Sequence, residues 1–153
     1  MNNFYSLNPA EFFVAEEIQK RRPELQVFFP LKDVGADLLL VDPKRERPIY
    51  IQVKESRFYS KFGTSWHQLK AGKENEADVF VFVTYLPSAR RAKMTFVKDY
   101  MVIPKNRLIQ LCAKKKRMRD RFSFYFAPEN GKVFEVRDER IDVSEFHDAW
   151  NLI

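Results

Sequence analysis

Cysteine is almost missing from this chain of 153 residues, in which Cys112 is the only one. A single cysteine excludes an intrachain disulfide and a thiolate metal cluster, and it favours a reducing, cytoplasmic setting. Its place near the predicted end of a helix favours a partly buried structural thiol over a reactive one. No apolar run approaches the roughly 20 residues that a membrane-spanning helix needs, so we expect no membrane association. The first residues also lack the basic and then apolar pattern of a signal peptide.

Glycine and histidine are scarce as well, with four and two residues respectively. The sequence contains no glycine-rich phosphate loop, dinucleotide-binding fingerprint or nucleophile elbow, which argues against a nucleotide cofactor and against an α/β-hydrolase. His67 and His147 lie far apart and outside any zinc-ligand spacing. We therefore interpret both as ordinary surface or loop histidines.

Hydrophobic residues, by contrast, make up 45% of the chain and aromatic residues 15%, which predicts a packed core. The length favours one domain over residues 1–153, with a core over about 8–85 and basic additions over about 86–153. Within that core, residues 78–85 are almost continuously apolar, as expected of a central strand that is covered on both faces.

The remaining pattern predicts an α/β fold. Asn8 and Pro9 are typical of a helix start, and Pro23 ends that helix near Arg22. The other predicted elements are strands over 26–30, 35–41, 48–54, 93–97, 100–103, 122–126 and 132–136, helices over 104–112 and from 144 onward, and a polar, irregular loop over 55–73.

Two of these predicted strands carry polar residues at one end. The strand over 35–41 has Asp37 near its start, and the strand over 48–54 ends with Gln52 and Lys54. If the strands pair antiparallel across the charged turn between them, the three side chains meet at one edge of the sheet. A carboxylate, an amide oxygen and an ammonium group at one edge can hold a divalent metal ion and an attacking water, which predicts a nuclease-like site.

A glutamate, Glu11, precedes these residues on the predicted first helix. The order of helix glutamate, G-x-D strand (Asp37) and Q-x-K strand (Gln52 and Lys54) resembles the PD-(D/E)xK nuclease superfamily. The first helix is similar to that of archaeal Holliday-junction resolvases, and the Q-x-K motif is similar to that of Mrr-like restriction endonucleases. The resemblance covers residues from about 8 to 83. It implies a restriction-endonuclease-like α/β fold, with a mixed β-sheet core flanked by helices.

This resemblance implies a metal-dependent endonuclease that hydrolyses DNA phosphodiester bonds with Mg²⁺ or Mn²⁺. By resemblance, Asp37, the Gln52 side-chain oxygen and the Val53 carbonyl would bind the ion. Glu11 would bind it through a water or would hold a second ion. Lys54 would orient the nucleophilic water or stabilise charge on the phosphate. A homodimer is expected by analogy, since two cuts usually take two such sites.

Gln52 is also a departure from the usual Asp or Glu of this motif. Because an amide carries no charge, the ligand set is one charge weaker, and metal binding would be weak until DNA phosphates contribute. A second interpretation therefore stays open, in which the chain is a catalytically degenerate DNA-binding module on the same fold. A third is a protein-interaction domain whose basic surface meets an acidic partner.

Positive charge is concentrated in residues 88–121, which hold 12 Lys and Arg and 2 Asp, a net charge of +10 within a total of +6. Such a segment favours a polyanionic partner, because neutralised phosphates release counterions; a solvated surface helix is the alternative. Trp66 and Tyr59 can stack on bases, although loop aromatics more often close over a core. We predict DNA as the partner, with contacts from Ser56, Arg90, Arg91, Lys114, Lys115, Lys116, Arg117 and Arg119.

Overall fold

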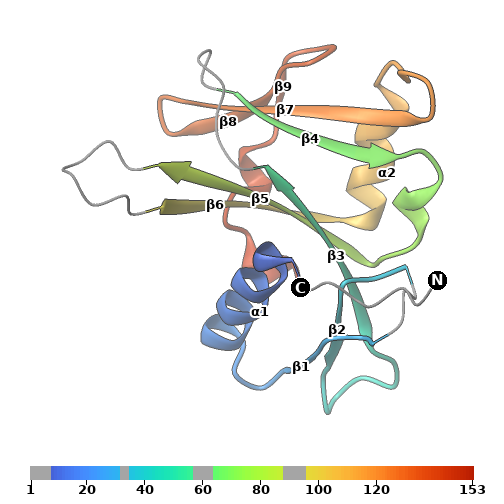
Figure 1. Cartoon of the computed structure of the whole chain (residues 1–153), viewed down its shortest axis with the longest axis vertical. Coiled ribbons are helices and arrows are strands. Elements are labelled where there is room, and N and C mark those ends of the chain that lie inside the picture. Colours follow the sequence, from blue (N-terminus) through green and yellow to red (C-terminus); the bar gives the residue numbers. More distant parts are fainter. Residues whose placement is uncertain (1–7, 32–34, 57–63, 88–95) are drawn as a thin grey trace.

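The computed structural model describes residues 8–31, 35–56, 64–87 and 96–153 (Figure 1). The helices are α1 (Pro9–Arg21) and α2 (Lys105–Ala113), with short 3-10 turns η1 (Lys73–Asn75), η2 (Ser144–Phe146) and η3 (Trp150–Leu152). The strands are β1 (Gln26–Phe28), β2 (Leu38–Val41), β3 (Ile49–Ser56), β4 (Ser65–Lys70), β5 (Val79–Pro87), β6 (Phe96–Pro104), β7 (Arg121–Glu129), β8 (Lys132–Glu135) and β9 (Ile141–Asp142). No helix among the described residues is long and apolar enough to cross a bilayer.

Helix α1 begins where the sequence predicts. The Ala10 N–H donates a hydrogen bond to the side chain of Asn8 at 3.1 Å, and Pro9 occupies the first helical position. The helix ends at Arg21, next to the predicted end. Its buried residues are Ala10, Glu11, Val14 and Ile18.

The first sheet has the strand order β1-β2-β3-β5-β6. β3 and β5 are parallel, whereas the other neighbours are antiparallel, which confirms the predicted mixed sheet. β5 lies between β3 and β6 and is apolar on both faces: Val79, Val81 and Val83 face one core, and Phe80 and Phe82 face the other. This alternation explains why the sequence of β5 is an unbroken apolar run.

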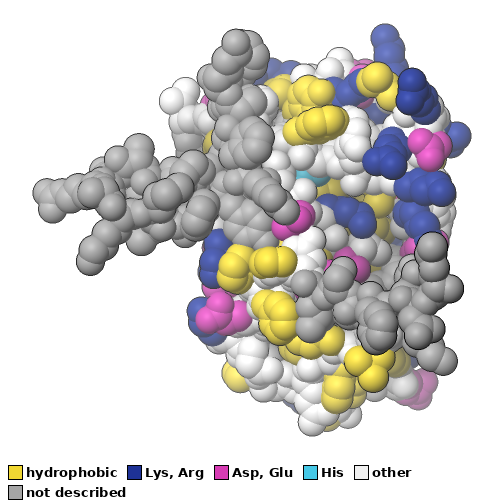
Figure 2. All heavy atoms as spheres, in the orientation of Figure 1, with side chains coloured by type: hydrophobic (Ala, Val, Ile, Leu, Met, Phe, Trp, Pro, Cys, Tyr) yellow, Lys and Arg dark blue, Asp and Glu magenta, His cyan; other side chains and the backbone are white. Residues whose placement is uncertain are grey.

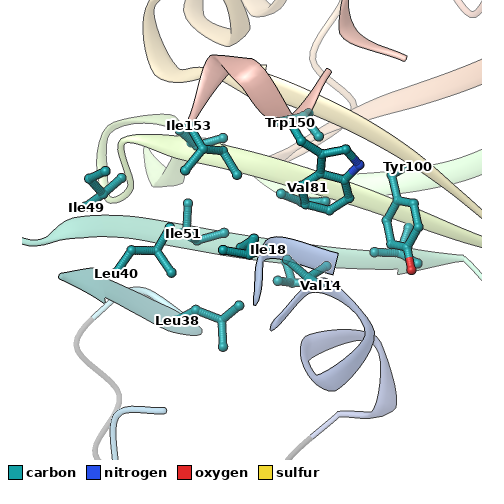
Figure 3. Close-up of a cluster of buried hydrophobic side chains, with 14 of the residues drawn as sticks. Val14, Ile18, Leu38, Leu40, Ile49, Ile51, Val81, Tyr100, Trp150 and Ile153 are labelled. Atoms are coloured by element: carbon teal, nitrogen blue, oxygen red, sulfur yellow. The ribbon is translucent and has the colours of Figure 1, made fainter. Parts of the chain in front are cut away.

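The two faces of this sheet are covered by different layers (Figure 1). On one face, Val14 and Ile18 of α1 pack near Ile51, and Trp150 closes the same core (Figure 3). Trp150 is 3% exposed and the centre of its ring lies 5.0 Å from that of Tyr100, so its side chain is part of this core. On the other face, α2 and a second sheet enclose a phenylalanine-rich core, whose aromatic members are Phe80, Phe82, Phe122, Phe124, Phe126 and Phe146.

The second sheet has the order β4-β7-β8-β9 and is antiparallel. It corrects the prediction of an irregular loop over 55–73, because Ser65–Lys70 forms strand β4; residues 57–63 lie outside the described part of the chain. Burial along β4 alternates strictly. Its inward residues are Ser65, His67 and Leu69, two of them polar, so hydropathy alone gives no period-2 signal.

Two further predictions about elements are wrong in detail. The last segment is not an α-helix from Ser144 but the two short turns η2 and η3. The strands predicted over 93–97 and 100–103 are one strand, β6, from Phe96 onward, and residues 93–95 lie outside the described part. β6 stays paired with β5 along its whole length, and this pairing overrides the polar interruption at Lys98 and Asp99.

Candidate functional site

The structure brings Asp37, Gln52 and Lys54 to one edge of the first sheet. β2 and β3 pair antiparallel, as predicted. The Asp37 N–H continues this pairing by donating a hydrogen bond to the Ile51 carbonyl at 2.8 Å. Gln52 and Lys54 alternate with the buried residues of β3, so they project from the face opposite to α1.

The Asp37 carboxylate is tied to the neighbouring strand. Its Oδ2 accepts a hydrogen bond from the Val53 N–H at 2.6 Å and another from the side-chain nitrogen of Gln52. Val53 thus takes part in the site through its N–H, and metal binding by its carbonyl stays a prediction. These two contacts hold the carboxylate at the sheet edge.

A cavity of about 490 Å³ lies at this edge. Glu11 of α1 lines it together with Asp37, Gln52 and Lys54, so all four predicted catalytic residues share one space. Glu11 is only 8% exposed, and its position at the edge of the buried side of α1 carries it from the helix toward the sheet edge. The helix and both strands therefore position one set of side chains.

The same cavity is lined by residues that sequence reasoning missed. Lys70 of β4, Lys73 of η1 and Arg121 of β7 add cations to its wall. Figure 2 shows Lys and Arg side chains gathered over the end of β4 and the start of β7. Strand β4 could not be predicted from the sequence. Its outward side chains could be placed only once its pairing with β7 was known. The other lining residues that were missed are Gly35, Ala36, Gln68, Leu69 and Glu76.

Gly35 shapes the chain just before Asp37. Its φ of +80° lies in the left-handed region, which favours glycine. A Cβ atom at this position would come within 3.0 Å of Glu76 Oε2 and 3.3 Å of Glu76 Cβ. The close approach of Glu76 and the backbone conformation therefore both require glycine in the segment that delivers Asp37.

His67 lies behind Lys54 and not at the surface, so the prediction of an ordinary surface or loop histidine is wrong for it. The ring is 2% exposed, packs against Phe82 and Phe126, and shares a hydrogen bond of 3.1 Å with the Thr84 hydroxyl. Burial lowers its pKa to about 3, although a hydrogen bond with the backbone of Lys54 acts in the opposite direction. A neutral histidine thus links β4 to β5 through the Thr84 hydroxyl.

This burial predicts a stability that falls in mild acid. Between the folded pKa of about 3 and the ordinary value of 6.5, the unfolded chain binds a proton that folded His67 does not. The free energy of unfolding should therefore decrease as pH falls below 6.5, with about 2 kcal/mol lost between pH 7 and pH 5. Urea denaturation of wild type and His67→Phe at both pH values measures this change. An equally large loss in the variant would contradict the assignment.

His147 and Cys112 agree with their predicted roles. His147 is exposed and its Nε2 pairs with Asp99 Oδ1. Cys112 is buried in α2, and burial raises the pKa of its thiol to about 12. A thiol that stays protonated is a poor nucleophile, so Cys112 is structural.

The residues predicted to contact DNA lie outside this cavity where the structure describes them. Lys114, Lys116, Arg117 and Arg119 are exposed between α2 and β7, but none of these four lines the cavity within the described part of the chain, and neither does Ser56. Arg90 and Arg91 lie outside the described residues.

The prediction that Lys115 contacts DNA is wrong. Its side chain is 1% exposed, and its Nζ lies 2.7 Å from Glu135 Oε1 in an ion pair beneath β7 and β8. The same Nζ lies 4.8 Å from the centre of the Phe124 ring. A lysine held in this way cannot reach a phosphate.

The donor set fits a hard divalent cation. Two carboxylates, those of Glu11 and Asp37, and the Gln52 amide are all oxygen donors of the kind that Mg²⁺ prefers. The Gln52 nitrogen faces Asp37, and a half-turn of the planar amide would present its oxygen instead. Among the described residues, no group of three or more His, Cys, Asp and Glu is arranged to hold a metal ion.

Comparison with known proteins bears on the fold. No protein-family model and no curated protein sequence matches the chain. The structure is similar to that of a bacterial homing endonuclease, I-Ssp6803I, with a TM-score of 0.54 and 17% sequence identity. The match covers 96% of this chain and 90% of the other chain, so both sheets take part in it. At this identity the similarity shows a shared fold, consistent with the predicted mixed sheet flanked by helices.

Proposed function

We propose that this chain is a metal-dependent endonuclease that hydrolyses phosphodiester bonds in DNA. The observation that carries the proposal is the cavity in which Glu11 of the first helix meets Asp37 and the Q-x-K residues of β3. These residues come from three separate elements, and a structural role alone gives no reason for their convergence at a solvent-accessible edge. The similarity to a homing endonuclease supports the same class of activity.

Each side chain has a role that its surroundings support. Asp37, Glu11 and the Gln52 amide oxygen would hold Mg²⁺ or Mn²⁺, whose chemistry is polarisation of the phosphodiester and activation of a water nucleophile. Lys54 extends from β3 into the same cavity, where its ammonium group can orient that water and stabilise the charge that develops on the phosphate. The fixed contacts of Asp37 keep the site organised before substrate arrives.

The cations of the cavity wall support DNA as the substrate. Lys70 and Arg121 line the same cavity as Lys54, so a phosphate backbone entering the cavity would meet several positive charges. These phosphates would also offset the missing charge of Gln52 in the ligand set. The exposed cations of the segment after α2 would extend the same footprint along the DNA.

The first test is cleavage of a panel of DNA substrates in Mg²⁺ or Mn²⁺. The panel includes linear duplex, supercoiled plasmid, single strand, flap and four-way junction. We expect wild type to cut at least one of them, and Lys54→Ala to lower the rate by roughly 100-fold or more, since it removes a group that stabilises transition-state charge. Lys44→Ala, in the exposed turn between β2 and β3, is the matched control and should cut at the wild-type rate.

The outcome separates the remaining interpretations. Binding of DNA without any cutting, unchanged by Mg²⁺ and by Lys54→Ala, would make the chain a DNA-binding module on this fold. Absence of both binding and cutting at low salt would favour a protein partner. Double-strand breaks, as opposed to nicks, would indicate the expected homodimer, whose two sites act on opposite strands.

A further inference from the structure

Trp66 is a large aromatic side chain on the outward face of a strand. It is 56% exposed, whereas its neighbours Ser65 and His67 are buried. In the pairing of β4 with β7 it lies opposite Tyr125. The two ring centres are 6.4 Å apart, and the ring planes are 80° from parallel. The edge-to-face contact steadies the indole while more than half of the residue stays in solvent.

The remaining outward residues of this ribbon are polar and basic. Gln68 lies opposite Ser123, and Lys70 lies opposite Arg121. The Arg121 guanidinium donates a hydrogen bond to Gln68 Oε1 at 3.1 Å, which holds the cation over β4. Successive outward residues of a strand are about 7 Å apart, so the aromatic end and the cationic end form one continuous track.

This track leads into the candidate active site. Gln68, Lys70 and Arg121 line the cavity that contains Asp37 and Lys54. A ligand that occupies the cavity and extends along β4 would therefore pass from the cations to Trp66. We call the outward residues Trp66, Gln68, Lys70, Arg121 and Tyr125 the β4–β7 platform.

We propose that the β4–β7 platform binds a single-stranded stretch of nucleic acid next to the cleaved bond, with one base stacked on Trp66 and phosphates at Lys70 and Arg121. The inference deepens the proposed function, on which its reference to a cleaved bond rests. It specifies a substrate class, namely DNA with an unpaired segment at the site, such as a flap or an opened junction.

The chemistry of the platform favours an unpaired strand over a duplex. Bases of a duplex are stacked on one another, so an indole on a strand face meets their edges and the backbone. A single strand offers free base faces, and aromatic stacking with neighbouring cations is the common way to bind it. A protein partner is less well matched, because Trp66 is the only exposed large hydrophobic residue among the described residues of β4 and β7.

Tryptophan fluorescence offers a direct test. The chain has two tryptophans, and Trp150 is buried in the opposite core, so quenching by a stacked base reports on Trp66. A short oligothymidylate and a hairpin duplex are titrated separately in EDTA, where binding is measured without cutting. We expect the single strand to quench the fluorescence and Trp66→Ala to weaken its binding by about 5- to 150-fold. Trp66→Phe should restore part of the affinity, and duplex binding should change little.

The controls separate this inference from the proposed function. Phe28→Ala removes an exposed aromatic of the first sheet and should leave single-strand binding unchanged. Equal single-strand affinity of Trp66→Ala and wild type, or equal losses for single strand and duplex, would overturn the inference even if the chain cuts DNA. A selective loss in Trp66→Ala, found together with no cleavage of any substrate, would uphold the platform and reject the nuclease.

Discussion

Replacing Asp37 with asparagine should abolish DNA cleavage while leaving the fold intact. Asp37 is one of the two carboxylates proposed to bind the ion, and Gln52 adds no charge, so the variant keeps only Glu11 as a charged member of that ligand set. Loss of the ion's Lewis-acid contribution costs several kcal/mol of transition-state stabilisation. We therefore expect the cleavage rate to fall by roughly 1,000-fold or more. Asparagine still has a side-chain oxygen that can accept the Val53 N–H, so the sheet edge should persist.

The measurement is single-turnover cleavage of whichever substrate wild type cuts, over a range of Mg²⁺ concentrations. Asp42→Asn is the matched control at the other end of β2, where the side-chain oxygen accepts the Lys44 N–H at 2.9 Å and asparagine can keep that bond. Binding of uncut DNA in EDTA should be similar for both variants and wild type. Near-normal cleavage by Asp37→Asn would place the chemistry elsewhere in the chain.

The sequence was sufficient to predict that Asp37, Gln52 and Lys54 meet at one edge of the sheet, because local rules of strand pairing determine this placement. A G-x-D strand and a strand ending in Q-x-K are joined by a short charged turn, which leaves antiparallel pairing as the simple solution. Period-2 alternation then puts Gln52 and Lys54 on one face. Glu11 could be added only through a resemblance, since nothing local relates a helix residue to a sheet edge.

The far wall of the cavity could not be predicted in the same way. β4 pairs with β7, which follows more than 50 residues later, and its inward side chains include a serine and a histidine. Burial of His67 depends on Phe82 and Phe126, which are also distant in sequence. Lys70 and Arg121 reach the site only through this long-range pairing, so neither propensity nor charge counting identifies them.

Lys115 lies in a run of charged residues, and its burial likewise could not be predicted from that run. Its replacement should be strongly destabilising. Lys115→Met leaves Glu135 as a buried carboxylate without its lysine, at an expected cost of about 3–5 kcal/mol in the free energy of unfolding. Its exposed neighbours Lys114 and Lys116 are matched controls in the same run. Their methionine variants should stay within about 0.5 kcal/mol of wild type, as is usual for surface positions. Guanidinium denaturation of the three variants measures the difference.

A second substitution distinguishes the ion pair from packing. Glu135 Oε1 accepts hydrogen bonds from the Tyr125 and Arg137 N–H groups, both at 3.1 Å, and glutamine can keep an acceptor there without the charge. Lys115→Met combined with Glu135→Gln should therefore recover much of the lost stability, because no uncompensated charge stays buried. If the double variant is as unstable as Lys115→Met alone, the lysine acts through its other contacts, with the Asp138 carboxylate and the Phe124 ring. Either result leaves Lys115 outside the DNA footprint, while its exposed neighbours remain free to contribute to the salt dependence of binding.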